Sequence, residues 1–317
     1  MNLTRFAAKG TLPKNVERRI AAHAAVPIQP ETNTERAVGW CQHGDELNLH
    51  PAWNYNNIVL MDLRIETLKP AGKDLKRLVR QRVAELEAEL KEPLPKFRKI
   101  EIRDVLKMDL RKKIPSKIST VPVLWDLARN RVYLYTQSQS VIDSFLLVFG
   151  QTFEVPTDIE GTLAWNDKAD LHTAPKFLTW LFYKSSQNNG EWMLPGLDRF
   201  VVQMGEKFLL GHGEAVAAFN GDADQARRAI AEGYSVRELP LCIFIGDKLW
   251  MGTLNTALQW KGVKLPTILG ETPEETAMET SELLAELDGM LRGMFAAFLE
   301  NAIDENAIIN WSKADRT

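Results

Sequence analysis

Residues 73–92 read KDLKRLVRQRVAELEAELKE, a run in which leucine and valine stand among charged residues. Leucine and valine recur there at intervals of three and four, at positions 75, 78, 79, 83, 86 and 90. This spacing predicts an amphipathic helix. Pro93 and Pro95 end it, because proline lacks the N–H that a helix interior needs. A second helix is predicted over about 97–113, so residues 69–117 should form a helical hairpin.

The hairpin carries an unusual charge. Between Lys69 and Lys117 there are sixteen Lys or Arg residues and eight Asp or Glu residues, a net +8, although the whole chain has a formal net charge of −3. The remainder therefore carries −11, of which −9 falls between Glu271 and Glu305. Charge segregated in this way creates a local field that the total conceals.

Within the second helix the basic residues are ordered. Four of them recur at intervals of four, namely Lys99, Arg103, Lys107 and Arg111, and such residues form one row along a helix. An apolar row lies beside it, formed by Ile102, Leu106, Leu110 and Ile114. We expect the apolar row to seat the helix and the basic row to contact phosphates, which position a protein on DNA without reading sequence. The predicted DNA-binding residues are Lys96, Arg98, Lys99, Arg103, Lys107, Arg111, Lys112, Lys113, Lys117, Lys76 and Arg80.

Composition sets the class of protein. The chain has 317 residues, is 45% hydrophobic and 26% charged, and contains two cysteines. It is long enough for two or three sub-domains. Its apolar runs are far shorter than the ~20 residues of a membrane span, and its N-terminus lacks the apolar core of a signal peptide. We expect a cytosolic protein without a disulfide framework and without contact with a membrane.

Strand and helix patterns alternate without regular βαβ units, which predicts an α+β fold. A strand is expected over 57–68, hairpins over 119–138 and 235–254, and a long C-terminal helix over 274–301, whereas 26–54 is expected to be loop. The predicted division is a central region (1–68 with 118–165), the hairpin arm (69–117), a second α+β region (166–270), and an acidic C-terminal helix and tail (271–317).

The sequence gives less support for nucleotide, cofactor or metal sites. There is no GxxxxGK[ST] or GxGxxG motif, so neither nucleotide hydrolysis nor a dinucleotide cofactor is expected. Cys41, His43 and His50 offer three metal ligands, one short of a structural zinc site. His23, His172 and His212 are isolated. We expect no cofactor and no metal.

A metal-dependent nuclease is one alternative. It would need clustered carboxylates and a lysine, and the candidates are Asp158, Glu160, Asp167 and Lys168. The acid and the lysine are adjacent here, without the usual intervening residue. A second alternative is an interaction protein whose basic arm docks on an acidic protein partner, or on its own acidic C-terminal helix across a dimer.

The order of the segments resembles the bacterial recombination-associated RdgC family. The residues that carry the resemblance are AVGW at 37–40, LKRLVRQRVAELEAELKE at 75–92, RDVLKMDLRKKIPSKIST at 103–120, VLWDLARNRVYLYTQSQSVIDS at 123–144, FEVPTDIEGTLAW at 153–165 and AIAEGYSVRELPLCI at 229–243. The resemblance covers roughly residues 3–300 and rests on segment order and scattered identities.

The resemblance implies a non-catalytic, sequence-independent binder of double-stranded DNA. Members of the family form closed homodimeric rings with a basic hole that encircles duplex DNA, and they restrain a RecA-type recombinase. The arm's tip would then contact the second subunit, with Ile114, Pro115 and Ile118 as dimer contacts, and the protein would be associated with the nucleoid.

Some positions depart from the family pattern. Pro115 and Ile118 replace aromatic residues. The family's basic run corresponds to AVAAFN at 215–220, and Tyr234 stands at a basic position. Arg227, Arg228 and Arg237 are the nearby residues that would compensate. The DNA role is therefore assigned mainly to the arm.

Overall fold

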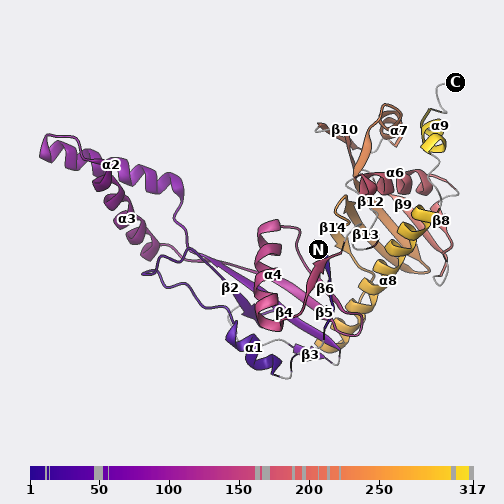
Figure 1. Cartoon of the computed structure of the whole chain (residues 1–317), viewed down its shortest axis with the longest axis horizontal. Helices are drawn as coiled ribbons and strands as arrows, with labels where there is room; N and C mark the ends of the chain where they lie inside the picture. The colour runs from indigo at the N-terminus through magenta and orange to yellow at the C-terminus, as the bar shows by residue number, and fades with distance from the viewer. Residues whose placement is uncertain are drawn as a thin grey trace.

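The structure is a computed structural model that describes residues 1–10, 13, 15–45, 53–55, 57–160, 165, 172–187, 190–194, 198–205, 207–212, 215–220, 223–300 and 305–313. Over these ranges the chain folds into two antiparallel sheets and eight helices, so the predicted α+β class is confirmed. One helical hairpin projects from the rest of the molecule (Figure 1). No helix in the described part of the chain is long and apolar enough to cross a membrane.

The first sheet is built from the N-terminal third of the chain and the segment after the hairpin. Its strands, in spatial order, are β2 (Arg36–Cys41), β4 (Ile58–Thr67), β5 (Lys117–Asp126), β6 (Arg131–Leu134), β1 (Thr4–Ala8) and β7 (Thr157–Ile159), with β3 (Trp53–Tyr55) paired to β4. β4 and β5 pair over ten residues, from Ile58 opposite Asp126 to Thr67 opposite Lys117. This long ladder forms the base from which the hairpin leaves.

A helix covers one face of this sheet. α4 (Gln139–Phe153) buries Phe145, Phe149 and Phe153, whose rings pack edge-on or tilted against Trp40 and Trp125. The Trp40 indole N–H donates to Thr152 Oγ1 at 2.8 Å. Because a buried indole that lacks a partner is costly, this bond fixes the position of β2. α1 (Val16–Ala22) packs beside α4.

The loop predicted over 26–54 is wrong in part, because it contains β2 and β3. β2 is held by pairing with the distant strand β4, and local periodicity does not show such pairing. Gly39 is required there: a Cβ at this position would lie 2.5 Å from the backbone nitrogen of Ala25. The close approach of the preceding segment therefore explains the glycine.

The second sheet lies in the C-terminal half. Its strands run in the order β11 (Ala215–Asn220), β10 (Lys207–His212), β12 (Ser235–Ile245), β13 (Lys248–Asn255) and β14 (Trp260–Lys264), while β9 (Phe200–Met204) pairs with β12 and with β8 (Glu191–Trp192). The helices of this half are α6 (Thr173–Ser185), α7 (Ala223–Ala231) and α9 (Glu305–Lys313). The predicted hairpin over 235–254 is confirmed by the pairing of β12 with β13, and the chain turns there at Gly246, with φ +54°.

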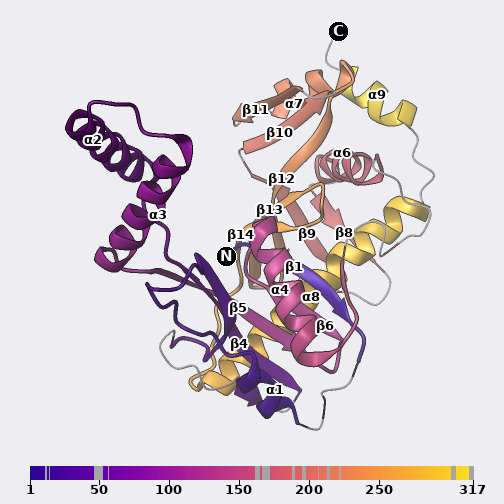
Figure 2. The same ribbon diagram turned by 60° about the vertical axis from the view of Figure 1, so that its left-hand side comes forward.

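The long helix α8 (Pro273–Glu300) connects the two sheets (Figure 2). It confirms the predicted C-terminal helix. Its apolar residues join the core of the second sheet, together with Leu60 and Leu124 from the first. Backbone hydrogen bonds between Leu3 and Trp260 also join the two sheets. The hairpin therefore projects from a body whose two halves share one core.

Candidate nucleic-acid interface

The predicted hairpin is present as α2 (Gly72–Leu90) and α3 (Lys96–Lys113). It leaves the first sheet where β4 ends and returns where β5 begins, and Thr67 and Lys117 lie opposite each other at that point. The two helices pack along each other and extend away from both sheets (Figures 1 and 2). We call residues 72–113 the arm.

The turn at the tip of the arm is closed by local contacts. Lys91 adopts a left-handed conformation with φ 54° and ends α2. The Glu87 carboxylate accepts the Leu94 N–H at 2.9 Å and the Lys99 ammonium at 2.8 Å, which ties both helices to the turn. The bond from Lys99 lowers the pKa of Glu87 below its usual value.

The base of the arm is attached to the body by charged groups. Glu35, just before β2, forms ion pairs with Lys107 and, at 3.8 Å, with Lys69. The bond from Lys107 lowers the pKa of Glu35. Arg111 is 1% exposed and donates to the Thr34 carbonyl at 2.6 Å. These contacts attach α3 to the segment that leads into β2.

These contacts correct the predicted basic row. Arg111 is buried against the body, so its guanidinium is not exposed to a phosphate in this structure. Lys99 and Lys107 are each shared with a carboxylate of the chain. In this row only Arg103 is exposed and has no ion pair among the described residues. Helical spacing assigned the four residues to one face, but it did not show that the body covers the end of that face.

Most of the other predicted contact residues are exposed. The ones with no ion pair in the described part of the chain are Lys76, Arg80, Lys96, Lys112, Lys113 and Lys117. Arg98 is exposed and pairs with Glu101 at 2.8 Å. With Arg103, the arm and its junction with β5 thus present seven unpaired cations from the predicted set. Such groups are available for phosphate oxygens.

The residues predicted for the dimer contact do not lie at the tip. Ile114, Pro115 and Ile118 connect α3 to β5 at the base of the arm, and Ile118 lies opposite Glu66 in the sheet. The tip is formed by residues 91–95. A contact made by the tip therefore cannot use the three residues, and their role toward a second copy stays a prediction.

The candidate metal ligands have other partners. His43 Nδ1 lies 2.7 Å from Asp62 Oδ1, Cys41 is buried, and His50 lies outside the described residues. No cluster of three or more potential metal ligands is found in the part of the chain that the structure describes.

The nuclease candidates are also separated. Glu160 is buried and forms ion pairs with Arg131 and Arg292, and Asp158 is exposed on β7. Asp167 and Lys168 lie outside the described residues. Among the isolated histidines, His23 donates a hydrogen bond from Nδ1 to the Arg19 carbonyl oxygen at 2.9 Å, His212 packs against Tyr234, and His172 precedes α6.

The acidic C-terminal helix uses many of its carboxylates internally. Glu279 accepts the Leu269 and Gly270 N–H groups at 2.7 and 2.9 Å, Glu286 pairs with Lys248 at 2.7 Å, and Asp288 is buried with Arg5 at 2.6 Å. These groups are not free to receive the arm of a second copy. This weakens the alternative in which the arm docks on α8.

Sequence reasoning missed an apolar groove on the arm. It has a volume of about 510 Å³ and is lined chiefly by Leu86, Leu90, Leu94, Ile102, Val105 and Leu106. Leu90 and Val105 are 55% and 61% exposed. Val105 lies outside the predicted apolar row, and this apolar residue off the row was the one sign of the groove in the sequence.

Comparison of the chain with models of known protein families and with curated proteins finds no match.

Proposed function

We propose that this protein binds double-stranded DNA through phosphate contacts made by the arm, without reading sequence and without chemistry of its own. The observation that carries the proposal is a set of seven exposed cations with no ion pair among the described residues, six on a helical hairpin that projects from the body and one, Lys117, at its junction with β5. Because the hairpin projects from the body, duplex DNA would reach these charges without obstruction by the two sheets. The resemblance in segment order to the RdgC family supports the same function.

The proposal extends to assembly. As in the resembled family, two copies would close into a homodimeric ring around the duplex in the nucleoid and limit access of a RecA-type recombinase. The arm would supply cations to the hole of that ring. Sedimentation at several protein concentrations tests the dimer. Slower loss from circular than from linear duplex of equal length tests closure.

The first experiment is fluorescence anisotropy of a labelled 30-mer duplex of random sequence over a series of salt concentrations. Affinity should fall steeply with salt. The logarithm of the association constant should fall linearly with the logarithm of the salt concentration, with a slope of about −0.9 for each phosphate neutralised. Lys96→Glu with Arg103→Glu should weaken binding to all sequences alike and lower the slope by about 2. These two residues are seven apart on α3, so they share a face.

The matched control is Lys9→Glu with Arg18→Glu. Both side chains are exposed on the body, away from the arm, and have no ion pair among the described residues. The control changes net charge equally, so it should leave the duplex affinity close to that of the wild type. Equal loss in the two variants would show that net charge alone governs binding, and the arm assignment would be abandoned.

A second function, docking of the arm on a protein partner, is favoured by one observation. The groove that exposes Leu90 and Val105 offers apolar surface of the kind found at protein interfaces. Duplex binding and protein docking separate in one experiment. Val105→Gln adds no charge, so it should leave duplex binding unchanged if the arm binds DNA, whereas it would weaken binding to an apolar partner. No duplex binding at low salt would leave docking as the function of the arm.

A further inference from the structure

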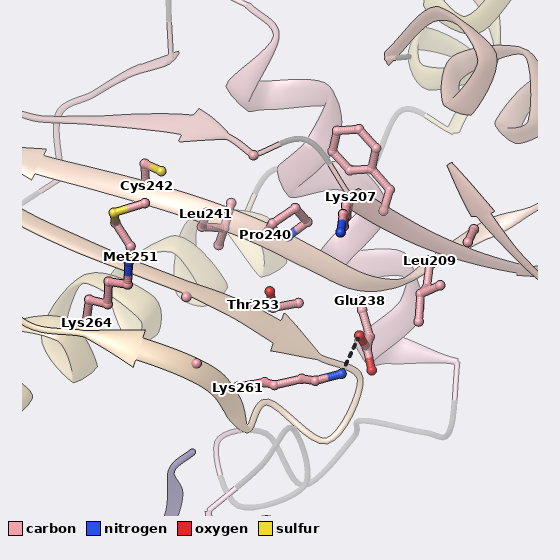
Figure 3. A pocket seen from close by; sticks show the side chains of 15 residues that line it. Lys207, Leu209, Glu238, Pro240, Leu241, Cys242, Met251, Thr253, Lys261 and Lys264 are labelled. Atoms are coloured by element: carbon pink, nitrogen blue, oxygen red, sulfur yellow. Dashed lines mark ion pairs between the residues drawn. The ribbon is translucent and has the colours of Figure 1, made fainter. Parts of the chain in front are cut away.

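One face of the second sheet carries no packed helix in the described part of the chain. Inward-facing residues such as Leu239, Ile243 and Trp250 pack toward α6 and α8, and the Trp250 indole donates to the Leu283 carbonyl of α8 at 3.1 Å. Alternation places Glu238, Pro240 and Cys242 on the opposite face. This face is hollowed by a groove of about 560 Å³ over β10, β12, β13 and β14 (Figure 3).

The hollow follows from the backbone. Gly205, Gly252 and Gly262 line it without contributing side chains. The strand register shifts between Leu209 and Leu210 in the pairing of β10 with β12, and near Met251 in the pairing of β13 with β14. Such irregularities bend strands and increase sheet twist. The groove is therefore formed by the path of the strands themselves.

The floor of the groove is mainly apolar. Leu209, Pro240 and Met251 line it, and Met251 is 36% exposed. A sheet face that remains in water normally carries polar residues. Methionine is suited to surfaces that receive varied side chains, because it is unbranched and polarisable. Leu209, Pro240 and Met251 thus form an apolar floor between polar side chains of the same lining, which would suit contact with another molecule.

The rim is basic. Lys207 and Lys264 line the groove and have no ion pair among the described residues, and Figure 3 places them at separate ends of it. Lys261 Nζ lies 3.6 Å from Glu238 Oε2, the one acidic side chain of the lining. Two uncompensated cations beside an apolar floor are complementary to an acidic partner with apolar anchor side chains.

Two other occupants fit less well. Phe208 is the aromatic residue of the lining, and it is 3% exposed, so it offers no ring face on which a base could stack. Burial raises the pKa of the Cys242 thiol. The thiol therefore stays protonated at neutral pH, and the groove presents no activated nucleophile. The geometry favours binding of a polypeptide.

We propose that this groove docks a segment of a partner protein that carries acidic residues beside one or two apolar anchor side chains. The apolar anchors would lie on Leu209, Pro240 and Met251. The acidic residues would pair with Lys207 and Lys264. This site is separate from the arm and does not depend on the DNA-binding proposal.

Selection from a displayed library of random 12-residue peptides on the full-length protein tests the proposal. Peptides that bind the wild type should be enriched in Asp and Glu next to Leu, Ile or Phe. The double variant Lys207→Glu, Lys264→Glu should bind them at least about tenfold more weakly, since reversed rim charges repel an acidic partner. Absence of groove-dependent enrichment, or enrichment of basic peptides, would overturn the proposal.

Cys242 gives a second readout on the native protein. It lines the groove and is partly accessible, whereas Cys41 is buried. A synthetic peptide of the enriched sequence should slow alkylation of Cys242 at saturation, and a peptide with its acids changed to Ser should not. Unchanged alkylation would place the peptide elsewhere and overturn the proposal.

Duplex binding tests whether the groove contacts nucleic acid instead of a peptide. The Lys207→Glu, Lys264→Glu variant should retain the wild-type duplex affinity, in contrast to the arm variant. If it loses as much duplex affinity as Lys96→Glu with Arg103→Glu, the groove is a nucleic-acid contact and the peptide proposal fails. If neither variant affects DNA, the DNA proposal fails while the peptide selection still decides the groove.

Discussion

The arm and the inner side of α8 both contain arginines and carboxylates, but they place them in opposite environments. On the arm nearly all charged side chains are exposed, and the buried residues are Leu75 and Arg111. At the inner side of α8 the charges are largely withdrawn from water. We call this second group the buried ionic cluster, which consists of Arg5, Arg131, Tyr133, Glu160, Asp288 and Arg292.

Asp288 is the centre of the buried ionic cluster. It accepts bonds from Arg5 at 2.6 Å, Arg131 at 3.0 Å and the Tyr133 hydroxyl at 3.1 Å. Burial raises the pKa of Tyr133, and the negative charge of Asp288 raises it further. Burial alone would lower the pKa of Arg131, but the charges of Asp288 and Glu160 outweigh it, and the pKa is raised. The cluster joins β1 and β6 to α8.

The difference between the two regions shows what a charge does in each. A buried charge that loses its partner is costly, because no water replaces it. An exposed pair contributes little to stability, because water and salt screen it. We therefore expect the buried ionic cluster to control folding and the arm to control binding.

The largest effect is expected from Asp288→Asn. It leaves Arg5 and Arg131 buried with only part of their compensating charge, so the free energy of unfolding should fall by about 3–5 kcal/mol. Urea denaturation followed by circular dichroism measures the change. Glu286 lies on the same helix as Asp288 and forms an exposed pair with Lys248 of β13. Glu286→Gln, which breaks this pair, should cost at most about 1 kcal/mol. Equal costs in the two variants would contradict the contrast.

Removal of the arm should have the converse effect. Residues 70–115 can be replaced by a short Gly/Ser loop, because Thr67 and Lys117 lie opposite each other in the sheet. The body should retain its cooperative unfolding, since the arm contributes little to either core. Duplex binding should be lost at physiological salt, as measured by anisotropy. A truncated protein that binds duplex like the wild type would place the DNA contact on the body.

Glu35 tests the junction between the two regions. Its pKa is lowered in the folded protein by Lys107, so its stabilising contribution is present above its usual pKa of about 4.5 and is lost as the pH falls through the lower folded value. The protection of the α3 amides near Lys107, measured as exchange relative to an unstructured amide at the same pH, should therefore fall more below pH 4.5 than the protection of the buried strand β4.

The Glu35→Gln variant is the control for this titration. It should show faster exchange in α3 already at neutral pH, with a local cost of about 0.5–1 kcal/mol, and it should lose the additional acid-induced step. An acid response in α3 that is the same in the variant and the wild type would show that another group holds the base of the arm.

The smallest effect is expected from Glu101→Gln on the arm. This change removes the exposed partner of Arg98, and the free energy of unfolding should change by less than about 0.5 kcal/mol. Duplex affinity should rise slightly, because a repelling charge is lost and Arg98 is freed for phosphate. Thermal unfolding and anisotropy on one preparation measure both quantities. A stability loss larger than the gain in binding would show that the pair is structural.

Local patterns predicted the elements with strong periodicity. The apolar spacing over 73–92 gave α2, and the charged helix after Pro95 gave α3 within one residue of its observed start. The hairpins over 119–138 and 235–254 and the long helix α8 were also predicted from local patterns. In each case the residue pattern that predicts the element lies within a few turns of helix or a few residues of strand, so local backbone geometry determines the structure.

Partners distant in sequence were not predictable in this way. β2 was missed because its pairing with β4 is long-range. The sequence placed Arg111 in a row with Arg103, but only the folded body buries Arg111 against Thr34.

The sequence by itself therefore determined the hairpin, its +8 charge and the α+β class, because helix periodicity, proline and charge act locally. Only the tertiary structure decided which of those charges remain free, that Asp288 joins two distant arginines, and that a groove opens between Lys207 and Lys264. Burial and pairing depend on which surfaces the whole folded chain brings together. The residue pattern of one segment does not show which other segment will cover it.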